Sequence, residues 1–421
     1  MRCRMRLLHA ADLHVDSPLR GLSAYDGAPV EAIRSATRHA VGNLVQLALT
    51  QGVDAVLLAG DIYDGDWPDY NTGLFFRNQM QRLGEAGVNV YLVSGNHDAA
   101  SQITRKLSLP GNVREFSKHN AETLEDEALG LAVHGQGYAV RDVTDNLAMN
   151  YPAPRAGLFN VGLLHTALNG REGHARYAPC TVEQLQARGY DYWALGHVHT
   201  HEVVAADPHV VFPGNVQGRH AKETGRKGCV LIDVGSDGRA SLDFRDLDVV
   251  RWEHLEVDAS DATDLDDVLG EVRSALAGAH ERAEGRLLAA RVSIVGSSDA
   301  HFELWHDHVR LTTEVRALGS DFGEVWIEKV RPATKPSAAR TDAAGLAEGL
   351  GTVADLRRTA AGLRADEDAL RKLVERSPLA ASLPPEALGP TALDVTDAGW
   401  RAVLFDQAVD LLVAMVEEGS R

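Results

Sequence analysis

Five short apolar runs in the first half of the chain each lead into residues that can bind a metal ion. The runs lie at residues 7–8, 55–59, 90–93, 161–164 and 192–195. The metal-competent residues at their ends are Asp12, His14, Asp61, Asn96, His97, His165, His197 and His199. Short apolar runs bounded by glycine and polar residues indicate buried β-strands. Because ligands of open α/β sheets bind at the carboxyl ends of the strands, these runs predict one site at that edge.

The segments between the runs have helical spacing. Residues 31–51 are an example, with apolar side chains at Ile33, Val41, Leu44 and Leu47 and a stop at Gly52. Strands that alternate with helices predict an α/β sandwich over residues 1–250. Short apolar segments with Gly-rich turns between residues 210 and 248 predict antiparallel strands that close the sheet.

The rest of the chain predicts two further regions. Strand-like segments at 252–257, 287–295 and 325–327 and a helix at 265–276 indicate a small α+β module at 251–331, with a linker before its last strand. The segment from Arg331 to Arg340 is rich in Pro, Ser and Ala, so residues 332–340 are interpreted as a linker. Residues 341–421 have helical spacing. They form either a small bundle packed on the rest or a docking surface for a partner.

The charge and the cysteines limit the class of protein. The formal charge of −18 opposes a general electrostatic attraction to nucleic acid, so such a function needs local basic patches or a partner. Three isolated cysteines, at 3, 180 and 229, argue against a disulfide framework and favour a reducing cytoplasm. The basic start resembles a signal peptide, but its short apolar run leads into Asp12, so we expect it to be retained. No stretch approaches the ~18 apolar residues of a membrane span.

Each metal-competent fragment is weak evidence when it is taken alone. A single histidine after a strand, such as His134 or His174, is more often a satisfied or surface residue, and Asp61 or Asp98 would also serve as a helix cap. Gly95-Asn-His-Asp98 is more specific, because asparagine is an unusual metal ligand and its neighbour His97 would face a substrate phosphate. Five such fragments in sequence favour a functional site.

The mixture of Asp, Asn and His ligands suits Mn²⁺, Fe²⁺ or Zn²⁺ better than Ca²⁺, and the lack of thiolates argues against structural zinc. Asp61 could bridge two cations. Two cations about 3.5–4 Å apart would activate a hydroxide and hold phosphoryl oxygens during in-line attack.

The order Asp-x-His, Gly-Asp, Gly-Asn-His-Asp, His and Gly-His-x-His resembles the calcineurin-like metallophosphoesterase superfamily over residues 6–235. Within it, the details are similar to the SbcD-type DNA-repair exonucleases, the nuclease subunits of double-strand-break repair complexes. The segments that carry this resemblance are Ala11-Asp-Leu-His-Val-Asp-Ser-Pro-Leu19, Ala59-Gly-Asp-Ile-Tyr-Asp64, Gly95-Asn-His-Asp98, Pro213-Gly-Asn-Val-Gln-Gly-Arg219 and Glu223-Thr-Gly-Arg-Lys-Gly228.

The resemblance implies a four-layer α/β/β/α sandwich, a capping domain at 251–331 and roles for the site residues. One metal would be held by Asp12, His14 and His199, and the other by Asn96, His165 and His197, with Asp61 between them. His97 would be the catalytic imidazole, which stabilises the transition state or protonates the leaving oxygen, and Asp98 would orient it.

The resemblance further implies DNA as substrate, Mn²⁺ as the metal, a C-terminal region that docks on an SbcC-like coiled-coil ATPase, and a homodimer. Basic residues after the last ligands would contact phosphates: Arg219, His220, Lys222, Arg226 and Lys227. Arg331, Lys335 and Arg340 form a second basic group, although such side chains are more often solvated surface.

Two other functions compete with a two-metal DNA exonuclease. One is a phosphoesterase of small or protein substrates such as cyclic nucleotides or phosphoproteins. The other is a scaffold without activity, which the complete ligand set disfavours. Cleavage polarity, strand preference, endonuclease activity and the metal used in the cell stay open.

Overall fold

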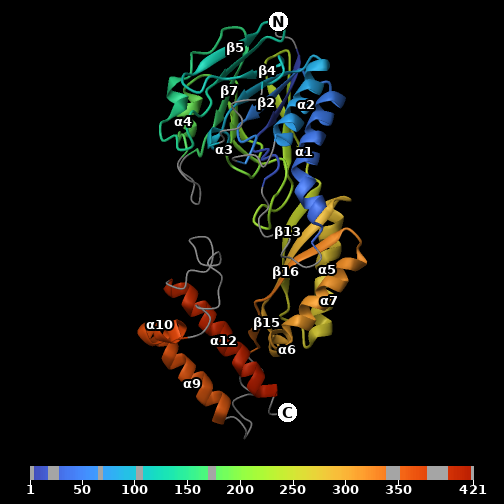
Figure 1. Ribbon diagram of the computed structural model, residues 1–421, viewed down its shortest axis with the longest axis vertical. Coiled ribbons are helices and arrows are strands. Elements are labelled where there is room, and N and C mark those ends of the chain that lie inside the picture. Colours follow the sequence, from blue (N-terminus) through green and yellow to red (C-terminus); the bar gives the residue numbers. More distant parts are fainter. Residues whose placement is uncertain are drawn as a thin grey trace. The chain divides into compact units, whose positions relative to one another are not determined.

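The structure is a computed structural model, and it describes residues 4–17, 28–64, 70–100, 108–168, 177–337, 351–376 and 397–418. The chain divides into two compact units (Figure 1). Unit 1 comprises Met1–Glu253 with Ala283–Ala289, and unit 2 comprises His254–Arg282 with Ala290–Arg421. None of the helices in the described residues combines the length and the apolar character needed to cross a membrane.

Unit 1 is built on two six-stranded sheets. The first has the order β12-β11-β1-β2-β3-β4, with strands at Ala240–Asp246, Gly228–Val234, Met5–Ala10, Ala55–Ala59, Asn89–Val93 and Val113–Glu115. The strands β1 to β4 are parallel, and β11 runs antiparallel to both β1 and β12. The second has the order β5-β6-β7-β8-β10-β9, with strands at Glu122–Asp126, Leu131–Gly135, Phe159–His165, Tyr192–Gly196, His209–Phe212 and Glu202–Ala206. Its inner strands β6, β7, β8 and β10 are parallel, and its edge strands β5 and β9 are antiparallel.

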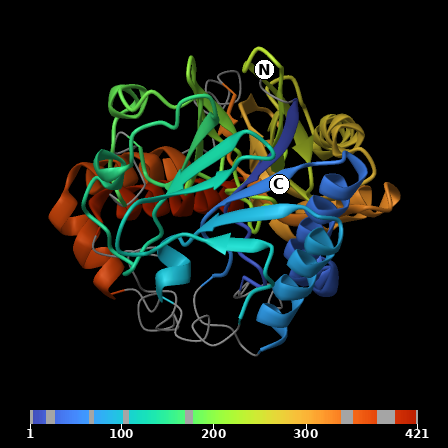
Figure 2. The same cartoon turned by 90° about the horizontal axis from the view of Figure 1, so that it is seen from above.

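The alternation of side chains along the strands separates three apolar cores. Leu7 of β1 and Ala194 of β8 lie in the core between the sheets. Leu8 faces the opposite way, toward the helices α1 (Val30–Thr50) and α2 (Asn71–Glu85), which lie side by side along the strands (Figure 2). Trp193 packs on the far side of the second sheet with η3 (Leu147–Asn150) and α4 (Val182–Gln186). The predicted four-layer α/β/β/α sandwich is confirmed, with short helices on the second sheet.

The predicted elements of unit 1 are correct where the apolar pattern is strong. The helix expected at 31–51 is α1, and the φ of +60° at Gly52 follows its end. Of the strands expected to be antiparallel at 210–248, β11 and β12 are, whereas β10 pairs parallel with β8. The pattern does not predict β4 and β5, because these short edge strands carry mostly polar residues.

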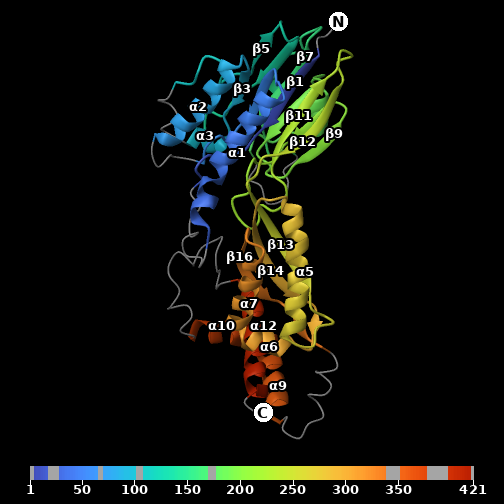
Figure 3. The same cartoon turned by 90° about the vertical axis from the view of Figure 1, so that its right-hand side faces the viewer.

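Unit 2 contains a three-stranded sheet of β13 (Val250–Asp258), β14 (Leu287–Val295) and β16 (Val325–Pro332), which lies beside helix α5 (Leu265–Ala283) in Figure 3. The prediction of a linker between the second and third of these strands is wrong. That stretch holds helices α6 (His301–His306) and α7 (His308–Asp321), which bury Leu304, Leu311 and Val315.

The linker predicted at 332–340 also begins as ordered sheet. Residues 335–336 form strand β17, which pairs in parallel with β15 (Ser297–Ser298), and Lys335 donates its backbone N–H to the Gly296 carbonyl at 2.8 Å. Pro336 is tolerated because this two-stranded sheet asks little of its backbone nitrogen. Residues 338–340, with the predicted basic residue Arg340, lie outside the described residues.

The C-terminal region contains three described helices, α9 (Gly351–Ala365), α10 (Glu367–Arg376) and α12 (Ala398–Glu418). They pack against one another, and α12 also contacts α6. Leu370 and Val413 are buried in this group, and Arg364 pairs with Asp406 at 3.0 Å. A helical C-terminal region is thus present, while its predicted docking role is not tested.

Candidate metal centre

The predicted ligands come from the carboxyl ends of strands in both sheets. Asp12, Asp61 and Asn96 follow β1, β2 and β3 of the first sheet, whereas His165 ends β7 and His197 follows β8 of the second. Two hydrogen bonds join the sheets here: His197 N donates to Asp12 Oδ2 at 3.0 Å, and His165 Nδ1 contacts the Ala59 carbonyl at 2.9 Å. The expectation of a single sheet edge is therefore wrong, since the packing of two sheets assembles the site.

The backbone turns sharply at four of these ligands. The φ angles are +51° at Asp12, +43° at His14, +51° at Asp61 and +104° at His197. L-residues rarely adopt such angles, which cost on the order of 1–3 kcal/mol each and concentrate at functional sites. The predicted period-2 geometry at Asp12 and His14 is thus wrong, because both lie beyond the end of β1 and strained turns direct their side chains.

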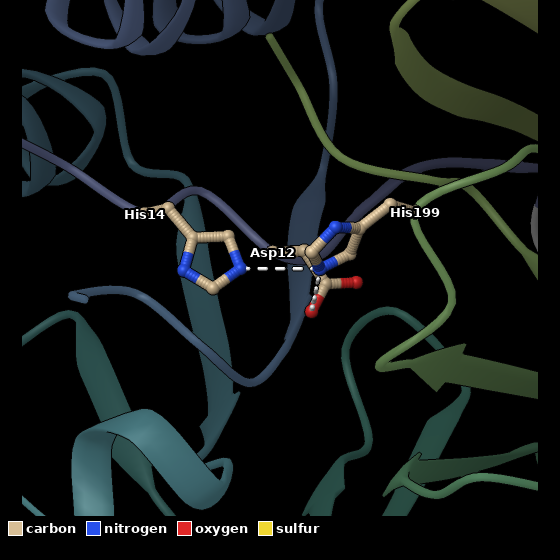
Figure 4. Close-up of side chains that lie close together, drawn as sticks. All are labelled: Asp12, His14 and His199. Carbon is tan, nitrogen blue, oxygen red and sulfur yellow. Dashed lines mark hydrogen bonds and ion pairs between the residues drawn. The ribbon is translucent and has the colours of Figure 1, made fainter. Parts of the chain in front are cut away.

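The first ligand cluster consists of Asp12, His14 and His199 (Figure 4). His14 Nε2 lies 3.2 Å from His199 Nε2, which in turn lies 4.0 Å from Asp12 Oδ1. His199 Nδ1 contacts Glu223 Oε1 at 2.8 Å and, facing a carboxylate, carries the proton. The lone pair of His199 Nε2 therefore points at the other two ligands, as binding of a cation requires.

The second cluster consists of Asp61, His165 and His197, with Asn96 beside them. His165 Nδ1 faces the Ala59 carbonyl, which can only accept, so His165 Nε2 carries a lone pair. That nitrogen lies 2.9 Å from Asn96 Oδ1 and 3.5 Å from Asp61 Oδ2. Gly95 permits this approach, because a Cβ there would overlap the Asp61 carboxylate.

Burial makes this site unfavourable for protons and favourable for cations. Burial and the neighbouring charge of Asp61 raise the pKa of Asp12 well above its usual value, and burial raises that of Asp61 to about 6. Burial lowers the pKa of His14 and brings that of His165 to about 3, so both imidazoles are neutral at pH 7. Neutral imidazoles and crowded carboxylates form a donor set that divalent cations would stabilise.

The structure therefore fits the predicted division of the ligands into two half-sites. His197 and His199 are only two residues apart, yet they belong to different clusters. The donors are nitrogen and oxygen atoms from His, Asp and Asn, and the buried Nδ1 of His14 has no hydrogen-bond partner. Divalent metal binding by these residues agrees with their geometry and protonation.

His97 is placed beside both clusters and pairs with a carboxylate. Its Nδ1 lies 2.7 Å from Asp64 Oδ1, and its side chain is 34% exposed. Burial alone would raise the pKa of Asp64, but hydrogen bonds from His97 and Ser17 and the charge of Arg219 lower it to about 2. Burial opposes protonation of His97, but the carboxylates of Asp64 and Asp61 outweigh it, so the pKa of His97 is raised.

The role predicted for Asp98 is wrong in its contact. The buried Asp98 carboxylate accepts hydrogen bonds from the backbone N–H groups of Ile62, Tyr63 and Gly95, at 3.2, 3.0 and 3.0 Å. Asp98 therefore ties the loop after β2 to the loop after β3, and the His97 imidazole is oriented by Asp64. Adjacency in sequence favoured Asp98, but on a helix successive side chains point about 100° apart.

The predicted basic group at residues 219–227 does not form an open patch. Lys227 is buried and donates to the His199 carbonyl at 2.7 Å, so it is not available to DNA. Arg219 is 12% exposed and pairs with Glu223, and Arg226 pairs with Asp246. His220 and Lys222 are exposed. Among the second group, the side chains of Arg331 and Lys335 are also exposed.

Two carboxylates of the site were missed as functional residues, namely Asp64 and Glu223. Both lie inside the segments that carried the family resemblance. The available signal was the second carboxylate of Gly60-Asp-Ile-Tyr-Asp64, three residues after a ligand. No sequence pattern shows that Glu223 reaches His199, because a 24-residue separation has no local geometry.

Family models match two parts of the chain. The model for calcineurin-like phosphoesterases matches residues 5–201, and a model for the middle domain of the metallophosphoesterase YhaO matches residues 252–335. The second match overlaps the predicted capping domain.

The chain is also similar to curated proteins. It is 37% identical to the uncharacterized metallophosphoesterase YhaO of Bacillus subtilis over 62% of this chain and 65% of the relative. It is 26% identical to the DNA double-strand break repair protein Mre11 of Methanopyrus kandleri, over 59% and 61%. It is 23% identical to the SbcD subunit of the nuclease SbcCD of Escherichia coli, over 56% and 66%. Each match thus spans less than two thirds of the relative.

These matches cover the strands, loops and ligand clusters described above. The residues that form both clusters, from Asp12 to His199, all lie within the matched phosphoesterase region. The chain belongs to the calcineurin-like metallophosphoesterase superfamily, as a metal-binding phosphoesterase related at low identity to the Mre11 and SbcD nuclease subunits.

Proposed function

We propose that this protein is a two-metal DNA nuclease that hydrolyses phosphodiester bonds, acting as an exonuclease in DNA repair with Mn²⁺ as the metal. The observation that carries the proposal is a complete site, in which two ligand clusters flank the His97–Asp64 pair. The names of the Mre11 and SbcCD relatives support DNA as the substrate.

The chain's own residues supply orientation and a proton. Asp12, His14 and His199 would hold one cation, and Asn96, His165 and His197 the other, with Asp61 between them. Bound cations would provide Lewis-acid polarisation of the phosphate and a nucleophilic hydroxide. Because His97 Nδ1 is engaged by Asp64, its Nε2 is the nitrogen left to contact the substrate. Asp64 stabilises the imidazolium, which can then protonate the leaving oxygen.

The test is cleavage of linear DNA by the purified protein with Mn²⁺. We expect degradation by the wild type and loss of at least about 100-fold in rate for H97A, the range for removal of a general acid. D61A should lose activity and bind Mn²⁺ more weakly. Arg155→Gln removes an exposed ion pair with Glu125 and serves as the control that keeps full activity. Intact DNA with the wild type under all metals tested would refute the nuclease proposal.

A phosphoesterase of small or protein substrates is the second candidate. The charge of −18 and the internal pairing of Arg219, Arg226 and Lys227 favour it, because they remove positive charge that would attract DNA. Efficient hydrolysis of a cyclic nucleotide or a phosphoprotein without DNA cleavage would establish this alternative.

A partner would supply the missing affinity for DNA. We infer that α10 and α12 dock on an SbcC-like coiled-coil ATPase, since Leu373, Val403 and Leu412 are 46%, 56% and 44% exposed on these helices. Co-purification with such an ATPase should be lost in V403D while Mn²⁺ binding is kept. Retained co-purification would exclude this surface. Homodimerisation, also proposed from the family, is tested by sedimentation.

A further inference from the structure

The segment that follows the last predicted ligands returns to the site through Glu223. This side chain is 8% exposed, and its carboxylate contacts four donors. They are His199 Nδ1 at 2.8 Å, Asn215 Nδ2 at 3.0 Å, the Arg219 backbone N–H at 2.8 Å and the Arg219 guanidinium at 2.7 Å. Glu223 therefore determines which nitrogen of His199 carries the proton, and it is itself held from several directions.

Arg219 extends this arrangement to the opposite side of the site. Its guanidinium contacts both Glu223 oxygens, through Nη2 at 2.7 Å and Nε at 3.2 Å. Its Nη1 lies 3.4 Å from Asp64 Oδ2, and the other oxygen of Asp64 lies 2.7 Å from His97 Nδ1. A continuous chain of charged contacts therefore runs from His199 through Glu223, Arg219 and Asp64 to His97.

The remaining contacts of the chain keep it rigid. Ser17 donates to Asp64 Oδ2 at 2.5 Å, and Lys227 donates to the His199 carbonyl at 2.7 Å. Arginine is suited to the central position, because its planar fork reaches two carboxylates with separate N–H groups, which a lysine ammonium cannot reproduce in the same plane. At 12% exposure, most of the Arg219 side chain is withdrawn from solvent.

We propose that Arg219 is a positioning residue, which couples the orientation of the metal-ligating His199 to that of the catalytic His97 through Glu223 and Asp64. It acts without contacting the substrate. This inference rests on the phosphoesterase activity and on the two-metal site of the proposed function, but not on DNA as the substrate. It replaces the phosphate-binding role predicted for Arg219 from its charge alone.

The experiment compares Arg219→Gln and Arg219→Lys with the wild type, and uses two readouts. Calorimetric titration of metal-stripped protein with Mn²⁺ should show about 10- to 100-fold weaker binding for Arg219→Gln, the usual effect of losing support behind a metal-ligating histidine. With bis(p-nitrophenyl) phosphate at saturating Mn²⁺, kcat should fall about tenfold or more while KM stays within about twofold. Arg219→Lys should be intermediate in both.

Arg291→Gln is the matched control, since it breaks a similarly buried, bidentate pair with Glu328 in unit 2. It should keep Mn²⁺ affinity, kcat and KM. A raised KM with unchanged Mn²⁺ affinity in Arg219→Gln would overturn the proposal and make Arg219 a substrate ligand. Unchanged affinity and unchanged kcat would overturn it as well.

Glu223→Gln keeps the shape of the side chain and tests the same chain of contacts if Arg219→Gln does not fold. It should weaken Mn²⁺ binding, because an amide cannot support His199 as a carboxylate does, and unchanged affinity would refute the proposal. Failure of the nuclease function is distinguished separately: a wild type that binds Mn²⁺ but leaves DNA intact rejects the substrate, while the titrations still decide on Arg219.

Discussion

At the scale of single residues, each functional imidazole is oriented by the contact of its other nitrogen. His165 Nδ1 faces a backbone carbonyl, His199 Nδ1 faces Glu223, and His97 Nδ1 faces Asp64. In every case the group that holds the ring is remote in sequence or separated from it by a turn. The chemical identity of a histidine is thus local, whereas the nitrogen it presents is decided by tertiary contacts.

Replacing Asp64 by asparagine should change the pH profile of catalysis. In the native site the carboxylates of Asp64 and Asp61 outweigh burial and raise the pKa of His97, so the imidazolium persists to higher pH. Asp64→Asn lowers this pKa, and the decline of kcat on the alkaline side should begin at lower pH. The measurement is kcat for bis(p-nitrophenyl) phosphate from pH 5 to 9. An alkaline limb at the wild-type position would contradict the role of Asp64.

At the scale of elements, the site depends on how closely two sheets approach. β2 and β8 belong to different sheets, yet a Cβ on Gly196 would overlap the carbonyl oxygen of Ala59. His9 of β1 makes a similar cross-sheet contact, since it lies 3.0 Å from the Tyr192 hydroxyl and 3.1 Å from the Leu195 carbonyl. These contacts fix the distance between the loops that carry Asp61 and His197.

Gly196→Ala should separate the ends of β2 and β8. Overpacking at such a position costs typically about 1–3 kcal/mol of unfolding free energy. Because His197 is the next residue, Mn²⁺ affinity should fall together with stability, as measured by urea unfolding and calorimetric titration. Gly270→Ala, in a helix where a Cβ would meet no atom within 4 Å, is the control and should keep Mn²⁺ affinity. Equal behaviour of the two variants would refute the close-approach argument.

The cross-sheet contact of His9 predicts an acid sensitivity. Burial lowers the pKa of His9 from 6.5 to about 3, so the unfolded chain takes up the proton first as the pH falls. Stability is therefore complete above pH 6.5 and declines toward pH 3. Between pH 7 and pH 5 this one group should account for roughly 2 kcal/mol of lost unfolding free energy. Urea unfolding of His9→Gln should show a smaller loss over that range than the wild type, and equal losses would contradict the prediction.

At the scale of the whole molecule, the site is complete but the charge opposes its proposed substrate. The chain carries 42 basic and 60 acidic residues, and three of the five predicted DNA-contacting side chains are engaged inside unit 1. Diffuse attraction of a polyanion is therefore weak. Affinity for DNA must come from the metal centre, from exposed groups such as Lys222, or from a partner.

DNA binding by the isolated chain should accordingly be weak and sensitive to salt. We expect a Kd above about 1 μM at physiological ionic strength, and a steep loss of affinity between 50 and 200 mM NaCl. Fluorescence anisotropy with a labelled duplex and the H97A variant, which prevents cleavage, measures both. A tight complex that salt does not weaken would show that the chain alone holds DNA.

Much of the fold and the centre could be predicted from the sequence, because the informative patterns are local. Buried strands are visible as apolar runs, and the residues that follow them are the candidate ligands. Asp98, Arg219 and Lys227 were misassigned for the opposite reason, since sequence proximity and charge do not reveal what a side chain contacts. The helices α6 and α7 were missed, as their weakly amphipathic pattern interrupts a region interpreted as a linker.

The sequence by itself therefore determined the identity and the order of the ligands, the superfamily and the layered α/β/β/α arrangement. Only the tertiary structure decided that two sheets share the site, that Asp64 holds His97, and that Glu223 and Arg219 stand behind His199. The physical reason is that strand ends are specified by local hydrophobic patterns, whereas side-chain direction depends on strained turns and on the packing of two sheets.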